Sequence, residues 1–327
     1  KKRSHSLLKY MVSIKRKYFL IALLSVSINV FAQYDAHFSH YWAVDNLYNP
    51  AAMNKNSQLN ITGSYAMQMA GYTRAPGSMY FGANTVLPFD HARHSGGLIM
   101  MNENIGLFTH KRLLANYAYK VKIGKGWLNL GIQGGVISEG FRYNKLVLID
   151  KNDPAFPASG DDGSGGELGA GAYYYNSGYY IGISAIHINS PRIYYSKDSG
   201  KSAYLDIKPA FYSMGGCNIQ LNNPLLSLQP CFMVATNTDY TRIDLTLRGS
   251  YEYESATFSG GLTYSPGTSV TVLLGGKYKQ VTIGYAYELF TSGVGAINGS
   301  HDLVVSYSMD VDFFKKGKNV HKSVRFL

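Results

Sequence analysis

The sequence has little charge, few cysteines and no long apolar run beyond its first residues. Of its 327 residues, 16% are charged and only two are cysteine. After Gln33 it has no apolar run of about 18 residues, which excludes a helical membrane protein. It also lacks the Cys-x-x-Cys, His-Glu-x-x-His, Gly-x-Ser-x-Gly and Gly-x-x-x-x-Gly-Lys patterns. We therefore predict that the protein is not an enzyme and holds no cofactor and no metal.

Acidic residues are absent before Asp35, where an export signal is expected. The basic residues 15–17 precede an apolar stretch at 18–31, and Val30-Phe31-Ala32 supplies the small or aliphatic side chains that a signal peptidase reads. The apolar stretch is too short for a transmembrane helix. Residues 1–32 are therefore predicted to be an N-terminal extension plus a signal peptide, cut after Ala32.

Removing this segment changes the charge balance. Seven of the 31 basic residues precede Asp35, so 24 remain against 20 acidic residues, a net charge of +4 rather than +11. The high isoelectric point thus belongs mostly to the targeting segment, and we expect no nucleic-acid partner.

What the sequence has is alternation, together with 35 Gly and 28 Tyr. In residues 242–254, Ile243, Leu245 and Leu247 alternate with polar side chains, and two tyrosines, Tyr251 and Tyr253, end the apolar face. In a membrane barrel this pattern means lipid outside, a polar lumen inside and tyrosine at the headgroup level. Export and alternation together predict an all-β fold, a transmembrane antiparallel β-barrel in the outer membrane.

Counting the runs between turn signals gives about fourteen strands, with the barrel at 57–314. An even number places both termini in the periplasm, with the longer connections at 146–165, 190–202 and 291–300 outside. The predicted strands are 57–67, 76–87, 95–103, 111–122, 127–140, 166–176, 178–188, 203–219, 226–237, 241–254, 256–264, 269–276, 280–290 and 301–313.

Two segments fall outside the strand pattern. Residues 33–56 are rich in aromatics and fit no period, and Asn49-Pro50 ends regular structure before the first strand. We predict a periplasmic or lumenal segment that acts as a plug or partner-facing cap at the periplasmic mouth; the alternative is an extension packed only on the rim. The basic tail 315–327 is expected in the periplasm, either solvated or docking a partner through Phe326 and Leu327.

Other candidate sites are weak. An acidic loop around Asp153 and Asp161 has calcium-type ligands, but Pro154 breaks the spacing, which favours a surface loop. His187, at a strand end before Ser190, would fit an outer-membrane hydrolase, although an ordinary rim histidine explains it as well. Cys217 and Cys231 fall on neighbouring predicted strands, and a disulfide and two free thiols both stay open.

Several motifs resemble one family, the PorP/SprF outer-membrane proteins of type IX secretion and gliding in Bacteroidota. The resemblance covers essentially the whole mature chain, although the family's usual Arg and Trp around the first strand are absent. The residues that carry it are His37-Phe38-Ser39-His40-Tyr41, Asn46-Leu47-Tyr48-Asn49-Pro50-Ala51, Asn102-Glu103-Asn104-Ile105-Gly106, Gly284-Tyr285-Ala286-Tyr287-Glu288 and Gly299-Ser300-His301-Asp302.

This resemblance implies a non-enzymatic barrel that works with periplasmic ring lipoproteins and with secreted cargo or adhesins carrying a C-terminal signal. The barrel would couple the ring to secretion or surface attachment, in contact with outer-membrane lipid. The alternative is a passive porin-like channel. The residues expected to meet partners are His37, Phe38, Tyr41, Trp42, Tyr48, Asn49 and Pro50, with Phe326 and Leu327 in the tail.

Overall fold

The computed structural model describes residues 35–53, 55, 58–89, 93–141, 162–195, 203–292 and 298–311. The predicted signal peptide and the predicted tail 315–327, with Phe326 and Leu327, lie outside the described residues. So do Asp153, Pro154 and Asp161 of the acidic loop.

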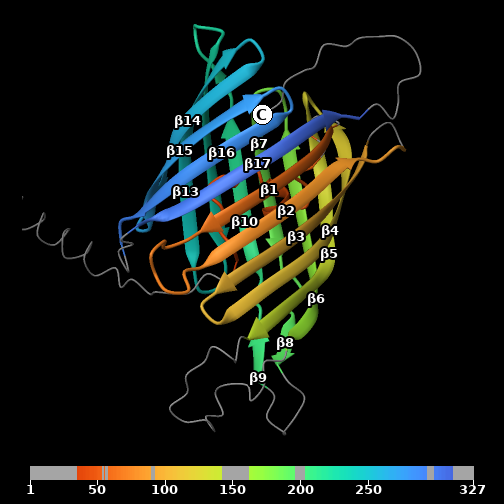
Figure 1. The fold of residues 1–327 in the computed structure, drawn as a ribbon. Helices are drawn as coiled ribbons and strands as arrows, with labels where there is room; N and C mark the ends of the chain where they lie inside the picture. Colours follow the sequence, from red (N-terminus) through yellow and green to blue (C-terminus); the bar gives the residue numbers. More distant parts are fainter. Residues whose placement is uncertain are drawn as a thin grey trace, which may run out of the picture. The chain divides into compact units, whose positions relative to one another are not determined.

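Fourteen antiparallel strands close into a barrel (Figure 1). Each strand pairs with the next, and β17 pairs with β1 to complete the ring. The strands of the ring are β1 (Gln58–Met67), β2 (Gly77–Val86), β3 (His94–Ile105), β4 (Phe108–Ile123), β5 (Gly126–Phe141), β6 (Gly163–Tyr175), β7 (Tyr179–Ile186), β10 (Ala210–Cys217), β12 (Leu226–Thr236), β13 (Thr241–Tyr253), β14 (Ala256–Ser265), β15 (Ser269–Tyr278), β16 (Val281–Phe290) and β17 (Ser300–Asp310).

The predicted fold class and strand number are confirmed, but one predicted strand is two. The run 203–219 divides into β9 (Ala203–Asp206) and β10, and β9 pairs with β8 (Arg192–Tyr195) in a separate hairpin. Pro209 separates them, since proline has no N–H to give to a ladder. A further short strand, β11 (Ile219–Gln220), pairs with β12.

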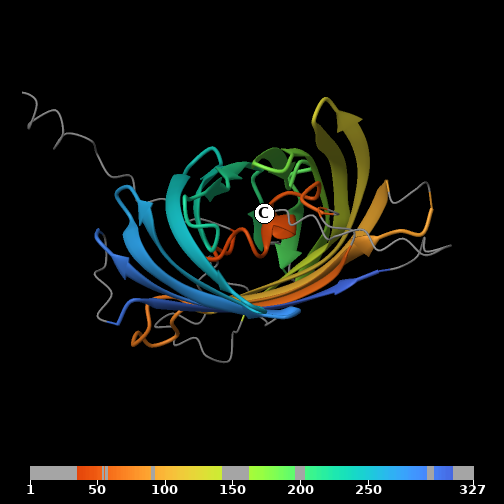
Figure 2. The same ribbon diagram turned by 90° about the horizontal axis from the view of Figure 1, so that it is seen from above.

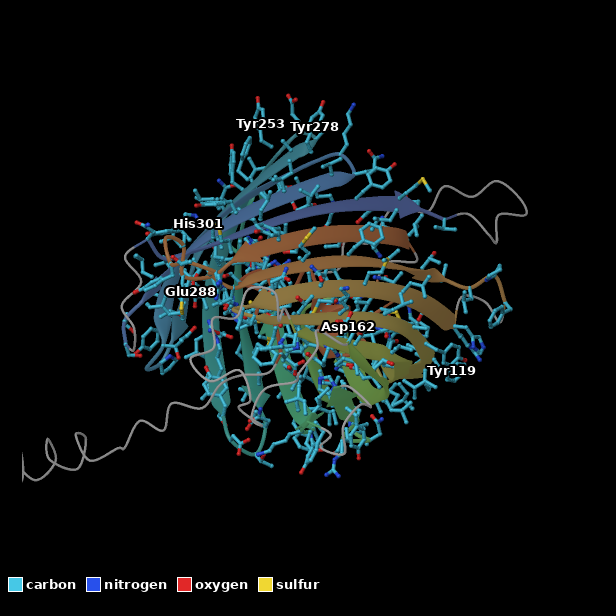
Figure 3. All side chains as sticks on the ribbon, turned by 60° about the horizontal axis from the view of Figure 1, so that its bottom comes forward. Tyr119, Asp162, Tyr253, Tyr278, Glu288 and His301 are labelled. Atoms are coloured by element: carbon cyan, nitrogen blue, oxygen red, sulfur yellow. The ribbon has the colours of Figure 1, made fainter. Side chains whose placement is uncertain are left out.

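The two faces of the wall differ as the alternation predicts. On β13, Leu245 and Leu247 are 49% and 50% exposed and face outward, whereas Asp244 and Thr246 face the lumen and are buried. Exposed tyrosines, including Tyr253 and Tyr278, project from one end of the barrel (Figure 3). Within the described residues, no helix is long and apolar enough to cross a membrane.

The two ends of the barrel have different connections. Residues 124–125, 176–178, 254–255 and 279–280 form tight turns at the end where β1 begins and β17 ends, here named the short-turn mouth. At the opposite end, the long-loop mouth, β5, β7 and β16 end before long intervals between successive strands of the ring, and the β8–β9 hairpin follows β7. The two mouths therefore differ in the length of their connections.

Candidate functional site

Residues 35–53, here named the plug, lie inside the ring of strands (Figure 2). They are mostly irregular, with one helical turn, α2 (Asp45–Tyr48). Phe38, Tyr41 and Tyr48 are almost fully buried in one apolar cluster with lumen-facing wall residues. Burying each such side chain contributes about 1.5–3 kcal/mol, so the aromatic residues hold this segment in the lumen.

The plug crosses the lumen from one mouth to the other. At its start, Asp35 contacts His187, the residue after β7, and so lies near the long-loop mouth. Two residues beyond its end, Lys55 lies over the rings of Tyr173 and Tyr180, near the short-turn mouth where β1 begins.

The first and last described residues of the barrel chain therefore sit toward opposite mouths, because β17 ends at the short-turn mouth. The prediction that both termini lie in the periplasm concerns residues outside the described part of the chain, and it stays a prediction. The plug is more than a cap at one mouth, since it contacts the wall from near one mouth to near the other.

Asp35 is the centre of a buried polar cluster. Arg112 Nη1 donates to Asp35 Oδ1 at 3.2 Å, the Tyr212 hydroxyl donates to Oδ2 at 2.8 Å, and His187 Nε2 lies 3.0 Å from Oδ1. Arg112 also pairs with Glu167. Burial alone would raise the pKa of Asp35, but His187, Arg112 and Tyr212 outweigh it and hold the pKa well below its ordinary value. Asp35 is thus a carboxylate anion, and its ionic contacts hold the start of the plug against the wall.

The hydrolase interpretation of His187 finds no support in this geometry. His187 is fully buried, and both of its ring nitrogens face carboxylates, Asp35 and Glu167. It positions the plug. Of the acidic loop residues, Glu167 lies buried on β6 and pairs with Arg112. The described residues contain no group of ligands that could hold a metal ion.

An early and a late part of the sequence meet in the lumen. His37 Nε2 lies 3.2 Å from Asp244 Oδ2, and Asp244 shares Arg242 with Glu288. The Ser39 N–H donates to Asp302 Oδ2 at 2.5 Å. Glu288 and Asp302 belong to the motifs near the far end of the sequence, so these motifs and the early motif form one contact surface.

The middle of the plug packs against β12 and β13. The Tyr41 hydroxyl lies 3.1 Å from Thr246 Oγ1 and 3.2 Å from the Cys231 sulfur. Trp42 is partly exposed, and the guanidinium carbon of Arg248 lies 3.9 Å from the centre of its ring. Both predicted aromatic anchors therefore contact the wall.

Asn49 joins the plug to the wall through main-chain atoms. Its Nδ2 donates to the carbonyls of Ala172 and Ile183, both at 3.1 Å, and its Oδ1 accepts from the Ala51 N–H at 2.9 Å. Just after Asn49, the main chain lies close to Gly131 of the wall. Only glycine leaves room for it, because a Cβ on Gly131 would lie 2.4 Å from the Ala51 nitrogen. The Asn-Pro-Ala sequence thus bends the chain while pressed on the wall.

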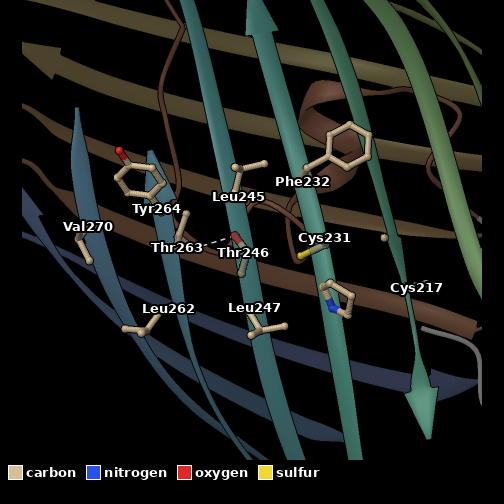
Figure 4. A pocket seen from close by; sticks show the side chains of 12 residues that line it. Cys217, Cys231, Phe232, Leu245, Thr246, Leu247, Leu262, Thr263, Tyr264 and Val270 are labelled. Atoms are coloured by element: carbon tan, nitrogen blue, oxygen red, sulfur yellow. Dashed lines mark hydrogen bonds between the residues drawn. The ribbon is translucent and has the colours of Figure 1, made fainter. Parts of the chain in front are cut away.

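Both cysteines are free in the structure. Cys231 lies opposite Gly216 in the register of β10 and β12, so Cys217, one residue further, projects from the other face of the wall (Figure 4). The disulfide left open by the sequence is therefore not formed, because a one-residue offset reverses the direction of a strand side chain.

All seven partner-binding candidates within the described residues, from His37 to Pro50, belong to the plug. Sequence reasoning missed the wall residues that hold it, including Arg112, Tyr212, Asp244 and Asn129, which donates to the carbonyls of Ala51 and Met53. Charged or amide side chains at lumen-facing positions were the available signal, but their partners could not be assigned.

Comparison with known proteins gives one family and one fold. The family model described as "Type IX secretion system membrane protein PorP/SprF" matches residues 30–307. No curated protein matches the chain.

Among solved structures, a deltaS2S3 mutant of the TodX monoaromatic hydrocarbon channel is similar, with a TM-score of 0.50 and 11% identity over 81% of this chain and 94% of that one. The toluene transporter TbuX of Ralstonia pickettii has a TM-score of 0.50 and 12% identity over 80% and 92%. These likenesses show the β-barrel fold.

Proposed function

Since the chain belongs to the PorP/SprF family of type IX secretion system membrane proteins, we propose that it is a non-enzymatic outer-membrane component of that system. It couples periplasmic ring components to the secretion or surface attachment of cargo proteins, including adhesins used in gliding. Export through a signal peptide cut after Ala32 delivers it to the outer membrane.

The observation that supports this proposal over a passive porin is that the plug occupies the lumen. The plug packs along the lumen and bonds to β4, β6, β7, β10, β13 and β17 through Asp35, His37, Ser39 and Asn49. A general pore needs an open water-filled lumen. A barrel filled by its own chain suits a scaffold that presents surfaces to partners at its two mouths.

The proposed partners follow the two mouths. Short turns mark the periplasmic side of bacterial barrels and long loops the outer side. We assign the short-turn mouth to the periplasmic ring lipoproteins and the long-loop mouth, with the β8–β9 hairpin, to cargo that carries a C-terminal signal.

The test replaces Tyr41 and Trp42 by Ala in the cells that export the protein. Removing both anchors loosens the plug without changing a strand, so the barrel should assemble while cargo delivery to the surface falls severalfold. The readouts are heat-modifiable migration of the barrel and the secreted and surface proteomes. The matched control is Tyr278→Ala, an aromatic removed from an exposed position outside the lumen.

Two outcomes would decide against the proposal. One is normal secretion in a strain that lacks the protein. The other is steady conductance of the purified intact protein in planar bilayers, which would favour the porin.

A further inference from the structure

Charge is distributed unevenly along the lumen. Near the long-loop mouth, lumenal arginines have carboxylate partners: Arg112 pairs with Asp35 and Glu167, and Arg242 with Asp244 and Glu288. Toward the short-turn mouth, cationic side chains gather on the lumen face and in the adjoining turns. Among the described residues they are Lys55, Arg93, Lys120, Lys122, Lys125, Arg248, Lys277 and Lys279, against Asp45, Glu252, Glu254 and Asp310. Of these, Lys55 pairs with Asp45.

Both tryptophans of the chain lie under these cations. Arg248 stacks on Trp42, with 3.9 Å from its guanidinium carbon to the ring centre. On the other side of the lumen, the ammonium groups of Lys120 and Lys122 lie 4.7 Å and 6.0 Å from the centre of the Trp127 ring. Stacking on an aromatic face fixes a cation in place without supplying it with an anion.

Arg248 differs from Arg112 and Arg242. In the described part of the chain no carboxylate pairs with it, and its buried Nε has no hydrogen-bond partner. Nearby, His40 is buried and its Nδ1 is also without a partner. Burial and, behind it, the charge of Arg248 lower the pKa of His40 to about 4, so His40 is neutral at neutral pH. An arginine held in the lumen with an unsatisfied donor lacks the anion that would offset its charge.

We propose that this basic and aromatic face binds an acidic polypeptide segment that enters from the short-turn mouth, with a carboxylate on Arg248. The cations belong to a lumenal face: Lys122 shares the strand face of the buried Asn116 and Ala118, and Arg248 that of the buried Thr246. A lipid headgroup lies against the outer wall, whereas an extended peptide can enter the mouth. That the peptide comes from a periplasmic partner rests on the proposed function; the binding itself does not.

The two tryptophans supply the measurement. In a Trp127→Phe variant of the full chain, purified in detergent, Trp42 is the only tryptophan and reports directly on Arg248. Titration with a short oligoglutamate peptide should change its fluorescence saturably. Arg248→Gln should weaken the apparent affinity by about tenfold or more, since a buried guanidinium–carboxylate pair is worth upward of 1.4 kcal/mol. Oligolysine should have no effect, and the control Lys208→Gln, which removes an exposed cation at the long-loop mouth, should bind as before.

Other results would overturn the inference. These are an unchanged signal with oligoglutamate, an equal response in the Arg248→Gln variant, or a response to phosphatidylglycerol micelles but not to peptide. If Arg248→Gln does not fold, a Trp42→Phe variant tests the face through Trp127, and a failure to respond there has the same meaning. The two proposals can fail separately. If the peptide binds but deletion of the protein leaves secretion normal, the proposed function is refuted while the peptide-binding site stands.

Discussion

At the scale of single residues, polar side chains set the position of the plug while aromatic rings supply its burial. Tyr41 and Tyr48 would favour any apolar surrounding. Asn49 is different, because its amide bonds two wall carbonyls and the Ala51 N–H together. Each such hydrogen bond contributes about 1 kcal/mol. Asn49 thereby fixes both the place and the direction of the chain.

We expect Asn49→Ala to loosen the plug without disrupting the barrel. In a Cys217→Ser background the only cysteine is Cys231, which is buried beneath Tyr41 and should react slowly with maleimide. Asn49→Ala should raise its labelling rate about tenfold, as a loss of about 1–2 kcal/mol implies. Asn189→Ala is the matched control, since Asn189 bonds the main chain of Gly166 and Leu168 outside the plug. Equal labelling in the two variants would refute the role of Asn49.

At the scale of elements, the strands could be predicted from the sequence because their side chains alternate with a period of two. Alternation on β13 and its neighbours gave fourteen strands because each side chain's face depends only on its own strand. The break before β10 was missed because Ile207 is apolar and continues the pattern, although it packs on Ile137 and Ile193 in the β8–β9 region. The path of the plug could not be predicted from local sequence patterns, because its contacts join residues far apart in the sequence, such as Ser39 and Asp302.

Wall and plug are matched in shape at Gly131 on β5. A larger side chain there would collide with the main chain at Pro50 and Ala51. Overpacking typically costs about 1–3 kcal/mol, and the strand pairs of β5 do not depend on this position. Gly131→Val should therefore assemble as a barrel with a displaced plug, seen as new conductance in planar bilayers. Gly249→Val is the control, because no atom lies within 4 Å of a Cβ added at Gly249. If the Gly131→Val barrel shows no conductance, the close fit between plug and wall at Gly131 is contradicted.

At the scale of the whole molecule, the plug runs through the lumen from the long-loop mouth to the short-turn mouth. Entering at Asp35 near the long loops, the plug crosses the lumen and turns into β1 at the short-turn mouth, and the strands then close around it. The plug and the motifs near the far end must both be in place for this, since His37 needs Asp244 and Ser39 needs Asp302. In the closed barrel, contacts from both early and late parts of the sequence therefore hold the plug in the lumen.

The orientation of this arrangement is open to a direct test in cells. In a background with both native cysteines replaced by Ser, Tyr194→Cys marks the β8–β9 hairpin and Lys125→Cys marks the β4–β5 turn; both positions are exposed. Because short turns face the periplasm, a membrane-impermeant maleimide should label Tyr194→Cys on intact cells and Lys125→Cys only after the outer membrane is permeabilised. The reverse pattern would place Asp35 on the periplasmic side. It would also move the basic and aromatic lumen face to the outer surface, where cargo rather than the ring would reach it.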